Sequence, residues 1–157
     1  MKALIQRVLS ASVKVDNQIV ANIRNGLLIL IGIRTDDTQE DIDYLVDKTI
    51  NLRIFSDESG KFNLSALDVA AELLIVSQFT LYGNIRRGRR PSFSAAATPE
   101  YAWPFFETIV DLFRTTGLNV ETGRFQENMV VSSENNGPVT IIIETNDRNV
   151  SKKTKLI

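Results

Sequence analysis

The stretch ELLIVSQFTL, Glu72–Leu81, decides the fold class, because it begins as a buried β-strand. Residues 73–76 form a continuous apolar run, which is typical of a strand covered on both faces. Three hydrogen-bonding side chains, Ser77, Gln78 and Thr80, then interrupt the run. Such a cluster indicates either the polar end of a strand or the floor of a binding site.

Further strands are predicted on both sides of this stretch. Two β segments flank a turn at Asp16-Asn17, as in a hairpin, and the apolar run of residues 27–33 is typical of another strand buried on both faces. Residues 52–64 indicate a strand, a glycine turn and an extended return. Later strands are predicted at residues 118–123, 128–133 and 138–145.

Two segments have the apolar spacing of amphipathic helices. The first follows the N-cap oxygens of residues 36–38, and its acidic residues complement the helix dipole, so we interpret them as helix chemistry rather than a metal site. The second begins with Thr98 as N-cap and ends at Gly117. Pro104 lies inside it, which indicates either a kink or a later start. The predicted buried positions are Ile42, Leu45, Val46 and Ile50 in the first helix, and Phe106, Ile109, Val110 and Phe113 in the second.

The pattern predicts a single, β-rich α+β domain over residues 1–145, with two helices packed on a curved sheet. A length of 157 residues, with 43% hydrophobic and 24% charged residues, is ordinary for a soluble globular protein. No apolar run reaches the roughly 18 residues that cross a bilayer, and the first residues do not resemble a signal peptide. A cytoplasmic location is therefore expected. The polar, lysine-rich residues 146–157 are predicted to form a frayed tail.

The absence of both cysteine and histidine from the chain restricts its chemistry. Without cysteine there is no disulfide and no thiolate nucleophile. Without histidine the commonest general base near neutral pH is missing, and so is a common zinc ligand. Ser-His-Asp and Cys-His mechanisms are therefore excluded. An enzyme of this composition depends on positioning, backbone dipoles, carboxylates or its own substrate.

The polar cluster after the apolar run is the first candidate site. The Thr80 hydroxyl is a possible nucleophile, although a weak one without a base, or else it hydrogen-bonds backbone at a strand end. Ser77 and Gln78 are either oxyanion donors or satisfied polar groups at the same strand end.

The second candidate is the stretch NNGPVT, Asn135–Thr140. A Gly-Pro pair before a strand is ordinary turn chemistry. A functional alternative needs a cis bond at Gly137-Pro138, which orients the neighbouring carbonyls as a trans peptide cannot.

The third candidate is the loop RRGRRPSFS, which contains four arginines. The net charge of −1 argues against a broadly basic nucleic-acid surface, but this loop suits locally held phosphates, and Phe93 could stack on a base. The alternative is a solvated loop. The arginines are Arg86, Arg87, Arg89 and Arg90.

Taken together, these motifs resemble those of the D-aminoacyl-tRNA deacylases, whose hallmarks are S-Q-x-T and N-x-G-P-V-T. The chain has them at residues 77–80 and 135–140, and the resemblance runs from Met1 to about Thr145 through QRV, NLRIFSDESGKFNLS, GRRPSFSAAA and ETGRF. It implies a barrel-like α+β fold and a homodimeric hydrolase that needs no metal or cofactor. The implied substrate is the ester between a D-amino acid and the terminal adenosine of tRNA, with mischarged glycyl-tRNA as a further substrate.

The resemblance also implies roles for single residues. The cis dipeptide would reach the partner subunit's pocket and reject L-amino acids, and Arg7 would hold that dipeptide. Phe125 and Met129 would pack around the bound aminoacyl-adenosine. Two other interpretations stay open, namely a non-catalytic RNA-binding module that uses the arginine loop and a purely structural oligomerisation domain. The implied catalytic residues are Ser77, Gln78, Thr80 and, through its main chain, Phe79.

Overall fold

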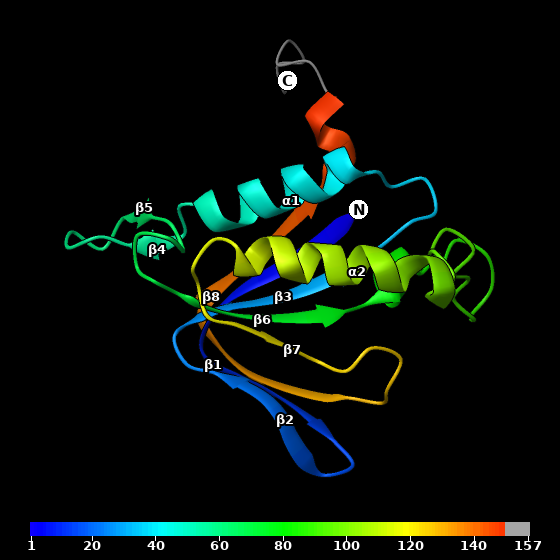
Figure 1. Ribbon diagram of the computed structural model, residues 1–157, viewed down its shortest axis with the longest axis horizontal. Helices are drawn as coiled ribbons and strands as arrows, with labels where there is room; N and C mark the ends of the chain where they lie inside the picture. The colour runs from blue at the N-terminus through cyan, green and yellow to red at the C-terminus, as the bar shows by residue number, and fades with distance from the viewer. Residues whose placement is uncertain (150–157) are drawn as a thin grey trace.

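The computed structural model describes residues 1–149, and it has the predicted α+β architecture. Figure 1 shows two α-helices lying over one face of a curved, barrel-like sheet, while a small hairpin projects from the side. The helices are α1 (Gln39–Asn51) and α2 (Pro99–Arg114), and the hairpin pairs β4 (Phe55–Ser56) with β5 (Phe62–Leu64). The sheet contains β1 (Lys2–Val15), β2 (Gln18–Ile23), β3 (Gly26–Gly32), β6 (Glu72–Ser77), β7 (Val120–Thr122) and β8 (Val130–Glu144).

Strand β1 organises the sheet, because it pairs antiparallel with β2, β3 and β8. On the far side of β3 the pairing becomes parallel, first with β6 and then with β7. The predicted hairpin between β1 and β2 is confirmed. Its turn residues Asp16 and Asn17 have φ values of 49° and 62°, the left-handed geometry that a tight hairpin turn requires.

Two hydrophobic cores explain why β3 and β6 are apolar on both faces. Leu27 and Leu73 belong to the core beneath the helices, together with Phe113. Their neighbours Leu28 and Leu74 point to the other face, because successive side chains in a strand alternate. There they join a second core inside the curve of the sheet. The positions of these two strands are therefore fixed by burial on both sides.

Both helices begin where the sequence predicts. Thr38 caps α1 and forms a capping box with Asp41. Burial by itself raises the pKa of the Asp41 carboxyl, but hydrogen bonds from Thr145 and Thr38 lower it below its ordinary value. Helix α2 starts at Pro99 and includes the exposed Pro104, so the later start is wrong. Because this proline lies near the start of the helix, the one backbone hydrogen bond that it removes does not end it.

The largest difference from the predicted elements concerns β8. Residues 128–133 and 138–145 were expected as two strands, but one strand spans Val130–Glu144 and includes the Gly-Pro pair. The register explains this, since Gln6 pairs with Thr140 and Val8 pairs with Asn135. Residues 136–139 therefore form a bulge opposite a single residue of β1. Proline is tolerated in a bulge on an edge strand, because no ladder bond needs its missing N–H.

Two element ends also differ from the predicted ones. Strand β6 stops at Ser77 and passes into a 3₁₀ turn, η1 (Phe79–Tyr82), so the strand does not reach Leu81. After β8 the chain forms a second 3₁₀ turn, η2 (Thr145–Asn149). Nη1 of Arg148 in this turn forms an ion pair with Oδ1 of Asp41 in α1 at 3.0 Å. The rest of the expected tail, residues 150–157, lies outside the described residues. Within residues 1–149, no helix is long and apolar enough to cross a membrane.

Candidate active site

A cavity of about 650 Å³ opens where β6 ends, and we call it the β6 cavity. The cavity is surrounded by the end of β6 and the start of η1, by the segment that leads into α2 and the start of that helix, and by the loop from β7 into the first residues of β8. Parallel strands commonly place ligand sites at their carboxyl ends, and β6 pairs parallel with both neighbours. The lining residues are Val76, Ser77, Gln78, Phe79, Phe93, Ala96, Ala97, Thr98, Pro99, Ala102, Phe125, Gln126, Glu127, Met129 and Val131.

The first three residues of the S-Q-x-T motif, Ser77, Gln78 and Phe79, form the floor of this cavity. The last ladder contact is the Gln78 N–H, which donates to the Ile31 carbonyl at 2.7 Å, and the chain then turns into η1. The Phe79 ring is 53% exposed and packs edge-on against Phe93, with 5.0 Å between ring centroids. The exposed Thr80 accepts a hydrogen bond from the Gln78 side chain but lies outside the cavity lining.

Two backbone N–H donors lie at the start of η1. The first hydrogen bond of the turn is made by Leu81, whose N–H donates to the Gln78 carbonyl at 3.2 Å. The N–H groups of Phe79 and Thr80 come before it and have no acceptor within the turn. Two successive N–H groups next to a cavity can stabilise a developing oxyanion.

The β6 cavity offers little acid-base chemistry of its own. Among its described lining residues, Glu127 is the only one with a titratable side chain. Tyr82 belongs to η1 but is buried, and burial raises the pKa of its phenol well above the ordinary value. That phenol stays protonated at neutral pH and is no general base. Apart from Glu127, any reaction in this cavity therefore depends on positioning, on backbone groups and on groups that the substrate brings.

The Gly137-Pro138 bond is cis, and both residues are exposed in the bulge of β8. We call residues 135–140 the Gly-Pro loop. Neither Gly137 nor Pro138 lines the β6 cavity of its own protomer. The structure thus separates the two motifs within one chain.

Arg7 anchors the Gly-Pro loop from below. Its side chain is buried, with 8% of the residue exposed, and Nε donates to the Asn136 carbonyl at 3.0 Å. Nη1 donates to the Ile54 carbonyl at 2.5 Å, next to the β4–β5 hairpin, and the Phe62 ring covers the guanidinium at 5.1 Å. The implied contact between Arg7 and the loop is therefore present.

Sequence reasoning missed the second anchor, which is Asn135. Its side-chain oxygen accepts from the Val139 N–H at 2.7 Å, and its amide nitrogen donates to the Val139 carbonyl and to the Thr140 hydroxyl, both at 3.1 Å. The side chain thus bridges both ends of the bulge. The available signal was the asparagine that begins the N-x-G-P-V-T motif. Phe62 had no comparable signal, because its contact joins segments far apart in the sequence.

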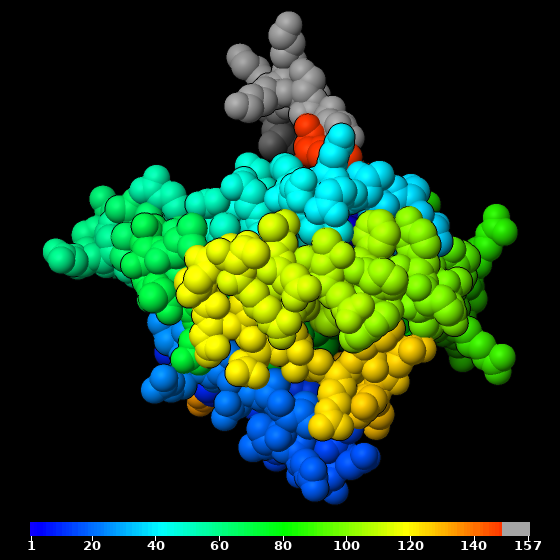
Figure 2. All heavy atoms as spheres, in the orientation of Figure 1, coloured from blue at the N-terminus to red at the C-terminus, as the bar shows by residue number. Residues whose placement is uncertain are grey.

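The remaining predicted residues are two side chains in the cavity lining and the arginines of the exposed loop. Phe125 and Met129 line the β6 cavity, as their implied role requires. The four arginines are exposed on a loop that projects from the surface (Figure 2) and is closed at its base by a bridge between Asn84 and Ser92. Phe93 packs against Phe79 in the cavity wall. The arginine loop therefore borders the cavity through Phe93.

Comparison with known proteins identifies the family. The family model for D-Tyr-tRNA(Tyr) deacylase matches residues 4–144. The chain belongs to this family. A D-aminoacyl-tRNA deacylase of Thermosipho africanus is 54% identical over 145 residues, which are 92% of this chain and 97% of that protein. A D-aminoacyl-tRNA deacylase of Aquifex aeolicus is 52% identical over 147 residues, which are 94% of this chain and 99% of that protein.

Two solved structures have the same fold. The structure described as c-Myc DNA unwinding element binding protein has a TM-score of 0.87 at 40% identity and covers 92% of this chain and 98% of its own. A probable eukaryotic D-amino acid tRNA deacylase has a TM-score of 0.79 at 17% identity, with 90% and 97% covered. The barrel-like fold expected from the motifs is therefore confirmed.

Proposed function

We propose that this protein hydrolyses the ester bond between a D-amino acid and the terminal adenosine of tRNA, and releases both. Its family and its relatives at about half identity support this substrate. The observation that carries the proposal is the β6 cavity, whose floor is Ser77, Gln78 and Phe79 of the S-Q-x-T motif and whose only titratable lining side chain among the described residues is Glu127. Such a cavity suits a substrate that is already activated, and an aminoacyl ester is one.

The reaction takes its reactivity from the RNA. The N–H groups of Phe79 and Thr80 stabilise the oxyanion that forms when water attacks the ester carbonyl, and each such donor contributes roughly 3–4 kcal/mol in other enzymes. The neighbouring 2′-hydroxyl of the terminal ribose orients or activates the water. Thr80 positions the floor through its bond with Gln78 and does not attack.

We propose that the complete site needs a homodimer. In one protomer the Gly-Pro loop lies outside the lining of the β6 cavity and presents Gly137 and Pro138 to solvent. Large apolar side chains are exposed on the same strands, among them Leu9 of β1 (54%) and Ile142 of β8 (65%). An interface that covers them brings the loop of one subunit to the cavity of the other.

Chirality is selected by exclusion. The backbone of the Gly-Pro loop, held by Arg7 and Asn135, binds the α-ammonium group and leaves no room for an L side chain at the adjacent carbon. A D side chain points away from this wall, so many D-amino acids are accepted. Glycine has no side chain to exclude, and mischarged glycyl-tRNA is therefore a further substrate. The enzyme acts in the cytoplasm on charged tRNA.

The arginine loop contributes local phosphate contacts. Arg86 and Arg87 line a small cavity of about 370 Å³ with Asn84 and Ser92. All four arginines are exposed, and their positive charge suits the backbone of the acceptor stem.

The deciding experiment compares D-tyrosyl-tRNA and L-tyrosyl-tRNA as substrates. Loss of the ester is followed with the purified protein and with a buffer control. We expect rapid loss of the D-ester and none of the L-ester above the buffer rate. Equal rates would refute chiral selection. Binding of tRNA with no hydrolysis of either ester would support the RNA-binding module instead.

A further inference from the structure

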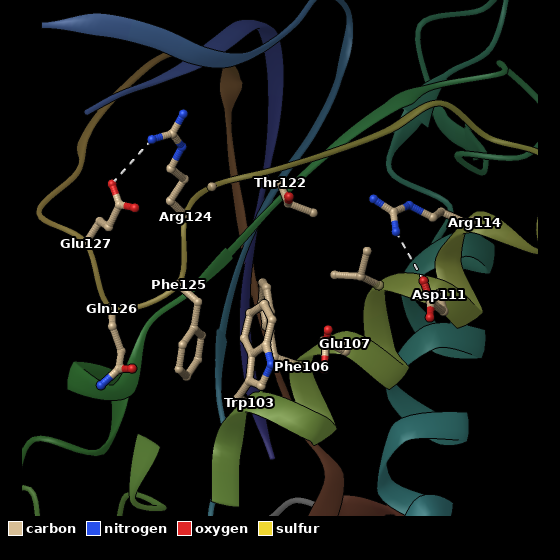
Figure 3. A pocket seen from close by; sticks show the side chains of 12 residues that line it. Trp103, Phe106, Glu107, Asp111, Arg114, Thr122, Arg124, Phe125, Gln126 and Glu127 are labelled. Carbon is tan, nitrogen blue, oxygen red and sulfur yellow. Dashed lines mark hydrogen bonds and ion pairs between the residues drawn. The ribbon is translucent and has the colours of Figure 1, made fainter. Parts of the chain in front are cut away.

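A second cavity, of about 570 Å³, lies beside the first along α2, and we call it the α2 cavity (Figure 3). The two cavities share Phe125, Gln126 and Glu127, so the loop between β7 and β8 forms a common wall between them. The other lining residues are Trp103, Phe106, Glu107, Val110, Asp111, Arg114, Thr122, Gly123 and Arg124.

An aromatic cluster forms one side of the α2 cavity. Trp103 packs on Phe125 and Phe106, with centroid separations of 5.0 Å and 6.5 Å. Phe106 is buried, whereas Trp103 is 42% exposed. The cluster thus holds the indole ring in place and leaves part of it accessible. A flat ligand can stack there without having to order the side chain first.

Charged side chains also line the α2 cavity. Glu107 follows Trp103 by one helical turn and lies next to it in Figure 3. Arg124 pairs with Glu127 at 3.7 Å, and both side chains remain about half exposed. The lining therefore combines an aromatic face, carboxylate acceptors and a guanidinium beside the wall shared with the β6 cavity.

We infer that the α2 cavity binds the cytosine base of the nucleotide that precedes the terminal adenosine of tRNA. The inference rests on the proposed function, because it places the terminal adenosine in the β6 cavity. The penultimate base stacks on Trp103, and the Glu107 carboxylate accepts from the exocyclic amino group of cytosine. The connecting phosphate crosses the shared wall near Arg124. Uracil has a carbonyl in place of that amino group and fits less well.

Intrinsic fluorescence tests this binding directly, because Trp103 is the only tryptophan of the chain. Cytidylyl-adenosine, adenosine alone and uridylyl-adenosine are each titrated into the protein in separate experiments. We expect cytidylyl-adenosine to quench the emission more than adenosine does, and uridylyl-adenosine to bind several-fold more weakly. If cytidylyl-adenosine quenches no more than adenosine up to millimolar concentration, the site is refuted. Equal binding of both dinucleotides refutes the recognition of cytosine.

Kinetics provide the second test. One substrate is a D-tyrosyl RNA minihelix that ends in CCA, and the other is D-tyrosyl-adenosine, which lacks the penultimate nucleotide. Stacking of one base on an aromatic side chain corresponds to roughly a 5- to 150-fold change in affinity. We expect Trp103→Leu to lower kcat/KM for the minihelix at least fivefold more than for D-tyrosyl-adenosine, mainly through KM.

Tyr101→Leu is the matched control. Tyr101 is a similarly exposed aromatic residue of α2 (38%) that does not line the α2 cavity. Tyr101→Leu should change kcat/KM by the same factor for the minihelix and for D-tyrosyl-adenosine. If Trp103→Leu also affects both substrates equally, the inference is wrong while the proposed function stands. If the wild-type protein hydrolyses neither substrate, the proposed function fails, whereas the fluorescence titration still decides whether the cavity binds cytosine.

Discussion

The S-Q-x-T segment and the Gly-Pro loop carry the two motifs of the family, but the fold holds them in opposite ways. The first ends a strand that is buried on both faces, where Val76 is 1% exposed, and it faces a cavity of its own protomer. The second is an exposed bulge on an edge strand and lies outside the lining of that cavity. Burial of apolar side chains places the first, whereas side-chain hydrogen bonds, mainly those of Arg7 and Asn135, place the second.

This difference predicts where the protein is sensitive to change. Many contacts of β6 share the task of placing the cavity floor, so no single polar side chain there is indispensable to its position. In the described part of the chain, the Gly-Pro loop is held mainly by Arg7 and Asn135, and the exposed Gln6 side chain reaches only the Thr140 hydroxyl, at 3.3 Å. Substitutions in or under the loop should therefore have larger effects than substitutions in the floor.

The largest effect is expected from Gly137→Ala. Gly137 has a φ of +135°, a backbone conformation that is strained for any residue other than glycine. A Cβ added there would lie 2.7 Å from Val139 Cγ2 and 3.1 Å from Arg7 Nη2. The added methyl group also occupies the surface that we propose meets the α-ammonium group. We expect kcat/KM for D-tyrosyl-tRNA to fall by at least about 100-fold, a loss of about 2.7 kcal/mol. Ester hydrolysis under single-turnover conditions measures it.

Gly60→Ala is the control for backbone strain. Gly60 also has a positive φ, of 78°, but nothing lies within 4 Å of its added Cβ. This variant should be slightly less stable and as active as the wild type. Unchanged turnover in Gly137→Ala, with an unaltered melting temperature, would show that the Gly-Pro loop is not part of the active site.

The second-largest effect is expected from Arg7→Lys. A lysine ammonium cannot reproduce the fork that reaches both Asn136 and Ile54, so one carbonyl loses its donor. Losing such a bond costs about 1–3 kcal/mol. We expect a lower melting temperature, about a tenfold loss in the rate on D-tyrosyl-tRNA, and measurable hydrolysis of the L-ester as the wall loosens. A stability loss with unchanged selectivity between the D- and L-esters would show that Arg7 supports the fold only.

The same contrast explains what the sequence could predict. The strands β3 and β6 and the helix starts at Thr38 and Thr98 follow from apolar spacing and capping, which are local signals. The course of β8 does not, because a Gly-Pro pair normally ends a strand. Here the part of β8 before the Gly-Pro pair pairs with β1 from Val8 onward, and the part after it pairs with β1 up to Gln6. Only this tertiary pairing shows that the two parts form one strand. The resemblance supplied the motif residues, Asn135 among them, but neither the contacts of Asn135 and Phe62 nor the α2 cavity could be inferred without coordinates.

The smallest effect is expected from Thr80→Ala. The Thr80 hydroxyl accepts a bond from Gln78, lies outside the lining of the β6 cavity and has no neighbouring base among the described residues. If it only positions the floor, its removal costs about 1 kcal/mol, or about a fivefold loss in kcat, and Thr80→Ser should match the wild type. A D-tyrosyl-tRNA whose terminal ribose lacks the 2′-hydroxyl should instead lose most of its reactivity. A 1,000-fold loss in Thr80→Ala, with the 2′-deoxy substrate still hydrolysed, would mean that Thr80 is the nucleophile. The floor would then depend on a single side chain as strongly as the Gly-Pro loop does, and the contrast between the two motifs would disappear.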